Sequence, residues 1–343
     1  MKSILALIFG LAISLILASL AGENPWLILK ILTINPLSTP YDIGMTLSYA
    51  TPLILCGLSV CVAFHAGLFN IGAEGQMTLA VVTAAAIGVL GPQWGMVSFF
   101  LGLVGALLAG TLWGAIAGLL KSYRQSHEVI TTMMLNFIAV GLANWLTLHM
   151  IANPQSQNPE SALIQTDYSL KANDLLAIYF KDTPLNNGLI FAVVLCFLLW
   201  IFLWRTPWGY ELRAVGYNPE AASRYGISIK KYQILALSLS GFFAAWVAYS
   251  EVFAGVGQYR LGFSPEYGFM GIAVALLAQN NPLKIIPSAL LFAVLHKGAT
   301  DLDLETTYIT RDFSRVLQAL VILSVSGQGA WQWLIDRKKN VRQ

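Results

Sequence analysis

The sequence predicts an all-α polytopic membrane protein with about ten transmembrane helices, or eight to nine as the alternative. Of its 343 residues, 57% are hydrophobic and only 11% are charged, whereas soluble domains carry about 25% charged residues. Ten apolar runs follow one another along the chain, and a helix needs about 20 mostly apolar residues to cross a bilayer. These observations exclude a soluble enzyme held at a membrane by a tail anchor.

The apolar runs contain few charged residues and are the expected membrane spans. They occupy residues 3–20, 43–64, 73–90, 96–120, 129–151, 188–204, 233–253, 268–279, 285–295 and 313–326. The first run resembles the apolar part of a signal peptide, but the many runs that follow it favour a retained first span. The eighth and ninth runs are short, and pairing them as one re-entrant hairpin gives the lower count. We expect ten spans in a single transmembrane domain that covers residues 1–343.

The positions of the lysines and arginines predict the orientation, because cationic loops are retained on the cytoplasmic side. With both termini in the cytoplasm, most basic residues lie in cytoplasmic segments, at Lys2, Lys121, Arg124, Arg205, Arg213, Arg224, Lys230, Lys231, Lys284, Arg337, Lys338, Lys339 and Arg342. This orientation makes 152–187 an extracytoplasmic loop, whose turn signals predict a small cap, and it makes 205–232 and the tail 331–343 cytoplasmic. The net charge of +3 therefore reflects topology and gives no support to a nucleic acid partner.

The most unusual stretch runs from Gly67 to Met77, with the sequence GLFNIGAEGQM between apolar residues. Its glycines weaken a continuous helix, and its polar side chains must be satisfied within protein or a water-filled cavity. We therefore predict a broken helix here. A carboxylate inside a membrane is a functional candidate by default, and three roles stay open for Glu74. It would cap half-helix ends together with Asn70, contact the substrate, or carry protons.

Other polar residues in the apolar runs have a structural and a functional interpretation. Asn136 and Asn144 lie eight residues apart, hence roughly on one helical face, where they would line a path or hydrogen-bond a neighbouring helix. The glycines between residues 102 and 118 form small-residue stripes that allow close helix packing. The three cysteines and four histidines lack the spacing of a disulfide framework or a metal site, so we expect no metal and no cofactor.

The cytoplasmic segment 205–232 mixes charged residues with small ones around Gly216 and Gly226. We expect it to form short helices outside the bilayer. A solvated helix with a small-residue side fits into a cleft of a partner, with charged side chains forming ion pairs around the rim. The alternative from the residues alone is that Arg213 and Arg224 only retain the loop inside and that the glycines only end helices.

Three motifs occur in order along the chain: FNIGAEG at 69–75, TPWGYELRAVGYNPEAA at 206–222, and YGFMGIAVALLA at 267–278 followed by Asn280-Asn281-Pro282. A weaker match is EVITTMMLN at 128–136. Together these motifs resemble the permeases of ABC importers of the simple-sugar and nucleoside class. The first motif resembles the nucleoside branch in particular, and the ribose-type string GIDLSVG is absent. The resemblance covers most of the chain.

The resemblance implies an ABC-importer permease fold with a broken or re-entrant helix and a cytoplasmic coupling helix. The substrate-path candidates are Asn70, Glu74, Gln76 and Asn136. The ATPase-coupling residues implied by the resemblance are Arg213, Ala214, Gly216, Asn218, Glu220, Ala221, Ala222 and Gly226. No residue is expected to be catalytic.

The resemblance also implies a bacterial inner-membrane subunit that moves nucleosides by alternating access. Its implied partners are an ABC ATP-binding subunit, a second homologous permease subunit and an extracytoplasmic substrate-binding lipoprotein. The chain lacks the phosphate loop GxxxxGK[ST], so ATP hydrolysis is expected in a separate chain. Two alternatives stay open: a permease for a simple sugar or other small polar solute, and a proton-coupled secondary transporter that uses Glu74 or Glu251. The absence of HExxH and GxSxG motifs disfavours an intramembrane enzyme.

Overall fold

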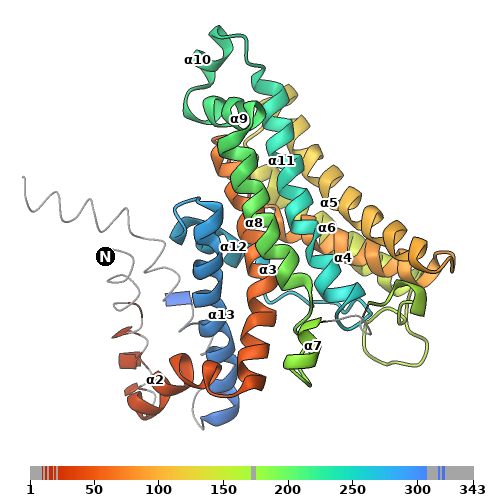
Figure 1. Cartoon of the computed structure of the whole chain (residues 1–343), viewed down its shortest axis with the longest axis vertical. Helices are drawn as coiled ribbons and strands as arrows, with labels where there is room; N and C mark the ends of the chain where they lie inside the picture. The colour runs from red at the N-terminus through yellow and green to blue at the C-terminus, as the bar shows by residue number, and fades with distance from the viewer. Residues whose placement is uncertain are drawn as a thin grey trace, which may run out of the picture. The chain divides into compact units, whose positions relative to one another are not determined.

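The computed structural model describes residues 22–170 and 175–306, together with residues 10, 12, 13, 15–17, 19, 20, 316, 319 and 320. In these ranges the regular secondary structure is helical, apart from two isolated β-bridges (Figure 1). The chain separates into unit 1, of residues 1–49 and 290–343, and unit 2, of residues 50–289. Two long helices, α3 (Pro40–His65) and α13 (Pro282–Glu305), belong in part to each unit.

Within the described ranges, seven helices are long and apolar enough to cross a membrane, and each coincides with a predicted span. They are α3, α4 (Ala73–Leu90), α5 (Met96–Arg124), α6 (Glu128–His149), α8 (Gly188–Arg205), α11 (Ile229–Ala245) with the π-helical turn after it (Tyr249–Phe253), and α13. The predicted span 268–279 corresponds to α12 (Tyr267–Leu277), whose 11 residues are too few to cross. The predicted spans 3–20 and 313–326 lie largely outside the described residues, and the predicted tail 331–343 lies wholly outside them.

Helix α13 is longer than the short apolar run predicted at 285–295. That run ends where Lys297 and Asp301 introduce charge, but their side chains pair one helical turn apart, with 2.6 Å between Nζ and Oδ1. Lys297 Nζ also lies 3.2 Å from Oδ1 of Asp42, near the start of α3. Because the charges are paired within the protein, they do not end the helix, which continues to Glu305.

Unit 1 packs α2 (Pro25–Thr33) against the second half of α13. Ile31 of α2 and Leu302 of α13 are fully buried in one cluster. Gly298 allows this approach, because a Cβ at this position would lie 2.6 Å from Cα of Leu32. A larger residue at Gly298 would therefore separate the two helices.

In unit 2, α11 packs along α5, and α4 contacts both helices. The contact between α5 and α11 follows the predicted glycine stripe. Gly110, Gly114 and Gly118 lie one turn apart, and a Cβ on any of them would collide with the backbone or a β-carbon of α11. The Cβ on Gly118, for example, would lie 2.8 Å from Cα of Ile234. The two helix backbones are therefore in direct contact, as small residues at an interface permit.

The loop predicted at 152–187 packs against the ends of α4 and α5. Its described part includes a 3-10 turn (Thr166–Tyr168) and the short helix α7 (Leu175–Tyr179). Tyr168 is fully buried, and its hydroxyl donates a hydrogen bond of 3.1 Å to the carbonyl oxygen of Pro92, which follows α4. The loop therefore forms a small cap over this end of unit 2.

Replacing Gly114 by valine should lower the thermal unfolding midpoint of the detergent-solubilised protein. The added side chain would push α5 away from α11, and overpacking of this kind costs about 1–3 kcal/mol. Gly141→Val in α6 is the matched control, because a Cβ at Gly141 meets nothing within 4 Å. Equal midpoints for the two variants would contradict the backbone contact between α5 and α11.

Replacing Lys297 by methionine should destabilise the protein strongly, because the carboxylates of Asp42 and Asp301 would lose their cation. Removing one partner of a buried ion pair costs about 3–5 kcal/mol. The double variant Lys297→Met/Asp301→Leu should recover part of this loss in thermal unfolding, and Lys181→Met, at an exposed lysine, should have little effect. No recovery in the double variant would show that burial of the unpaired charge is not the cause.

Candidate transport and coupling site

Helix α4 begins in the middle of unit 2. Helix α3 ends at His65, and α4 begins only after residues 66–72, which are not helical and which we call the linker. A Cβ on Gly110, halfway along the 29 residues of α5, would lie 3.2 Å from the carbonyl oxygen of Gln76. The first turn of α4 is therefore level with the midpoint of α5. The predicted interruption at Gly67–Met77 comprises this linker and this turn.

Four polar side chains from four segments meet beside the first turn of α4, and we call them the polar cluster: Ser59 of α3, Asn70 of the linker, Gln76 of α4 and Ser240 of α11. Asn70 donates from Nδ2 to Oγ of Ser240 at 2.6 Å and to Oε1 of Gln76 at 3.3 Å. The hydroxyl oxygens of Ser59 and Ser240 are 2.8 Å apart. All four residues are buried, so their polar groups satisfy one another inside a bundle that is mostly apolar.

Asn70 and Asn136 satisfy backbone groups that the missing helical turns leave open. Oδ1 of Asn70 accepts a hydrogen bond of 2.7 Å from the N–H of Gly72, directly before α4. Asn136 of α6 accepts a hydrogen bond from the N–H of Gly75 and donates one to the carbonyl oxygen of Ile71, each at 2.9 Å. The amide of Asn136 therefore holds both the linker and the first turn of α4.

Glu74 lies between the starts of two helices. It belongs to the first turn of α4, and its Oε2 accepts a hydrogen bond of 2.7 Å from the N–H of Gly268, in the first turn of α12. A Cβ on Gly268 would collide with the backbone of Glu74, so the close approach requires glycine. The partial positive charge at both helix N-termini favours a carboxylate here. This geometry is that of a helix cap.

The four predicted substrate-path candidates, Asn70, Glu74, Gln76 and Asn136, all lie around the linker and the first turn of α4. Asn144, eight residues after Asn136 in α6, makes no side-chain hydrogen bond within the described chain. The sequence did not single out Ser59 or Ser240, because one serine in an apolar helix carries no signal of the group that it faces.

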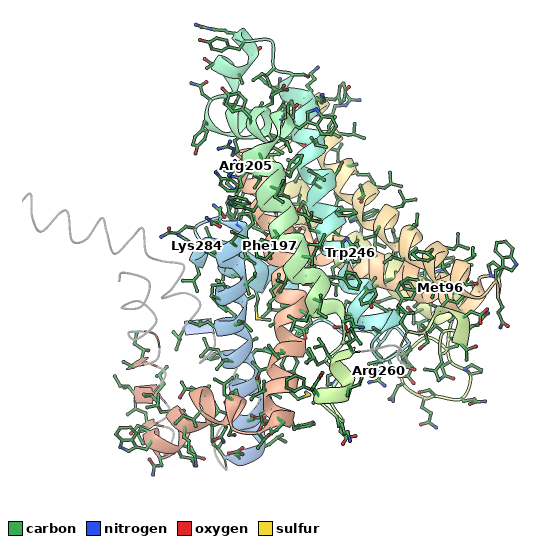
Figure 2. All side chains as sticks on the ribbon, in the orientation of Figure 1. Met96, Phe197, Arg205, Trp246, Arg260 and Lys284 are labelled. Carbon is green, nitrogen blue, oxygen red and sulfur yellow. The ribbon has the colours of Figure 1, made fainter. Side chains whose placement is uncertain are left out.

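The predicted coupling segment 205–232, called the coupling segment below, contains two short helices, α9 (Pro207–Tyr217) and α10 (Pro219–Arg224). They lie at the end of unit 2 opposite to α7 (Figure 1). Arg205, the last residue of α8, is at the same end as α9, and Arg260 lies toward the other end (Figure 2). The short helices predicted here are therefore present. The length of α8 separates them from the loop 152–187.

Each of these helices begins with a side-chain cap followed by a proline, the combination that favours a helix start. Oγ1 of Thr206 accepts a hydrogen bond of 3.1 Å from the N–H of Gly209. Oδ1 of Asn218 accepts one of 3.0 Å from the N–H of Ala221. Asn218, one of the predicted coupling residues, therefore sets the start of α10.

The predicted coupling residues differ in exposure. Asn218, Glu220 and Gly226 are exposed, Arg213, Ala214, Gly216 and Ala221 are partly buried, and Ala222 is buried. The guanidinium of Arg213 is turned inward, with its Cζ 5.4 Å from the ring centre of Trp204 in α8, a cation–π contact. The rings of Tyr217 and Tyr225 are exposed, with 87% and 88% of their surface accessible, and nothing in the sequence pattern singled them out. Aromatic side chains of this kind are typical anchors of an interface.

Helix α9 is in direct backbone contact with the linker. A Cβ on Gly216 would lie 2.9 Å from the backbone nitrogen of Gly67, and a Cβ on Gly67 would lie 3.2 Å from Cα of Gly216. Gly67 has a φ of +70°, a conformation that favours glycine. The coupling segment therefore touches the chain that leads into the polar cluster.

Residues 43–326 match a family model described as branched-chain amino acid transport system / permease component. This range contains the linker, the coupling segment and nearly all of the apolar helices of unit 2. The chain belongs to this permease family. The permease is accordingly a multi-pass membrane protein and a transport subunit without catalytic activity of its own. Its described part contains seven candidate spans.

Curated relatives of the permease are subunits of ABC transporters. The guanosine ABC transporter permease protein NupP of Bacillus subtilis is 31% identical, over 98% of this chain and 95% of its own length. The glucose ABC transporter permease protein TsgB13 of Haloferax volcanii is 31% identical, over 85% of this chain and 78% of its own. The guanosine ABC transporter permease protein NupQ of Bacillus subtilis is 26% identical, over 72% of this chain and 78% of its own. The permease is a subunit of an ABC importer.

Replacing Asn136 by alanine should destabilise the permease, because the N–H of Gly75 and the carbonyl oxygen of Ile71 would lose their partner. Each buried polar group left unsatisfied costs about 1–3 kcal/mol. Asn144→Ala in the same helix is the matched control, and its thermal unfolding midpoint should stay close to that of the wild type. A midpoint lowered equally by both variants would mean that Asn136 does not have this clamping role.

Proposed function

We propose that the permease imports nucleosides by alternating access. The proposal rests on the polar cluster, which offers hydrogen-bonding groups halfway along α5 in a bundle whose buried side chains are mostly apolar. A nucleoside has a polar sugar and a flat base, so it suits a path with both hydrogen-bonding groups and apolar walls. Asn70, Glu74, Gln76 and Asn136 border this path in the proposal. The guanosine transport named for NupP and NupQ supports this class of cargo.

The energy for transport comes from partner chains in this proposal. Two ATP-binding subunits dock at α9 and α10, a second and homologous permease subunit completes the pathway, and an extracytoplasmic lipoprotein delivers the substrate. Two relatives, NupP and NupQ, are permeases of guanosine transporters from one bacterium, which supports a heterodimer of permeases. The exposed Tyr217 and Tyr225, with Glu220 and Arg224 beside them, provide aromatic and charged groups for the ATPase contact.

The proposed orientation places α9 and α10 in the cytoplasm of a bacterial inner membrane, with both chain termini on the same side. Ser122, near the end of α5, donates a hydrogen bond of 3.2 Å to the carbonyl oxygen of Lys230, near the start of α11. The ends of α5 and α8 and the start of α11 therefore gather their basic residues at the end of unit 2 that carries α9. This gathering supports the cytoplasmic assignment of that end.

A second candidate cargo is a simple sugar. TsgB13, named as a glucose permease, is as similar in identity as NupP. Hydroxyl groups of a sugar would find the same hydrogen-bonding partners in the polar cluster. The family description, which refers to branched-chain amino acids, spans relatives of several cargoes and does not select among them.

Reconstitution of the complete importer in proteoliposomes tests the proposed cargo. Uptake of labelled guanosine, uridine and glucose is measured with and without ATP, and each unlabelled solute is added as competitor. We expect uptake of a nucleoside that requires ATP and that glucose does not compete. ATP-dependent uptake of glucose alone would favour the sugar candidate instead.

Replacing Glu74 by glutamine separates ATP-driven transport from proton coupling. The glutamine amide oxygen still accepts a hydrogen bond from Gly268, so we expect transport to persist, with a loss of stability of about 0.3–1 kcal/mol from the missing charge at each helix N-terminus. Uptake should also be unchanged when a protonophore collapses the proton gradient. Loss of all uptake in Glu74→Gln together with sensitivity to the protonophore would support a secondary transporter that uses Glu74.

A further inference from the structure

His65, the last residue of α3, is contacted from three directions. Its carbonyl oxygen lies against Gly216 of α9, where a Cβ would collide with it. Its ring packs edge-on against Trp204 of α8, with 5.3 Å between the ring centres and 90° between the planes. Its Nε2 forms a hydrogen bond of 2.8 Å with the carbonyl oxygen of Asn280. Since a carbonyl only accepts, Nε2 carries the proton.

Trp204 provides a second contact between His65 and α9. The guanidinium of Arg213 lies over the indole of Trp204, so His65 and Arg213 share one aromatic ring. Trp204 is in the last turn of α8, and α9 follows that helix after Thr206. A displacement of α9 therefore acts on His65 through the backbone of Gly216 and through the ring of Trp204.

From His65, contacts lead to the first turn of α4 by two routes. The first route is the linker itself, which carries Asn70 into the polar cluster. The second route is α12: Asn280 lies just beyond its end, and Gly268 at its start donates to Glu74. Both routes reach the turn where Gln76 and Glu74 lie.

The turn after α12, at Gln279 and Asn280, is held in part by the hydrogen bond from His65. Gln279 and Asn280 have φ values of 54° and 55°, a left-handed conformation that is unfavourable for Gln279 and that asparagine adopts more readily. Oδ1 of Asn280 is buried without a hydrogen-bond partner in the described chain. The carbonyl oxygen of Asn280 accepts hydrogen bonds from Nε2 of His65 and from Sγ of Cys61, the latter at 3.1 Å. His65 therefore helps to hold a turn with an unfavourable backbone.

We propose that His65 is the positioning residue that links movement of α9 to the first turn of α4. When the ATPase moves α9, Gly216 and Trp204 displace His65, and His65 displaces the linker and the turn after α12 together. This inference rests on the proposed function, because it takes α9 as the helix that the ATPase moves.

The test compares His65 variants in the reconstituted importer, with uptake and ATP hydrolysis measured in the same vesicles. His65→Ala should lower the amount of substrate taken up per ATP by at least about fivefold, the lower end of typical coupling effects. His65→Gln should restore most of this ratio, because its amide N–H is able to donate to Asn280. His127→Ala is the matched control, since His127 is exposed and should leave the ratio unchanged.

A second pair of variants tests the same contact from α9. Gly216→Ala places a methyl group against the backbone of residues 65–67 and should also lower uptake per ATP, by a similar factor. Gly141→Ala is its control, because a Cβ there meets nothing within 4 Å. Size-exclusion chromatography of each complex ensures that only assembled importers are compared.

If His65→Ala and Gly216→Ala both take up as much substrate per ATP as the wild type does, the inference is wrong. Nucleoside uptake by the wild type would leave the proposed function intact in that case. A loss in His65→Ala that His65→Gln does not restore would overturn it as well, because the donor to Asn280 would then have no role. If the wild type transports another solute, the proposed cargo fails, and the same ratio measured with that solute still decides the role of His65.

Discussion

A helix that is interrupted inside an apolar bundle has no water to satisfy its open backbone groups, and this constraint sets the positions of most polar residues in unit 2. The linker leaves such groups open at the level of the middle of α5. Asn70 and Asn136 satisfy three of them. Gln76 and Ser240 accept hydrogen bonds from the side chain of Asn70, and Ser59 pairs with Ser240. The polar residues around the start of α4 are therefore engaged with one another and with the backbone. A substrate that passes this region has to exchange hydrogen bonds with these groups or move beside them.

The same region depends on backbones that touch. Glycines of α5 meet the backbone of α11, Gly268 meets Glu74, and Gly216 meets Gly67. With no side chain between them, a shift of one segment cannot be absorbed by a change of rotamer, because packed interiors yield little. The contacts that allow close packing are thus also contacts that transmit displacement. This physical property connects the coupling segment to the start of α4, although the two lie at different levels of the bundle.

Much of the fold of unit 2 could be predicted from the sequence, because it depends on composition and on local residue patterns. The seven spans of the described part, the interruption at Gly67–Met77 and the short helices after Arg205 follow from apolar runs, glycines and small residues. The length of α13 does not, because Lys297 is neutralised partly by Asp42, which is remote in the sequence. The sequence also does not predict that Ser59 and Ser240 face each other, or that Arg213 turns inward onto Trp204. These features depend on which distant segments meet, and one sequence read along its length does not contain that information.

The contact between Lys297 and Asp42 also bears on how the protein is made. Asp42 is synthesised early and Lys297 late, so the carboxylate at the start of α3 lacks this cation during most of translation. An unpaired charge is costly within a membrane, and pairing with Lys297 removes this cost for Asp42 only after α13 has been made. The start of α3 and the second half of α13 consequently form this contact together, and a chain that stops before Lys297 lacks the cation for Asp42.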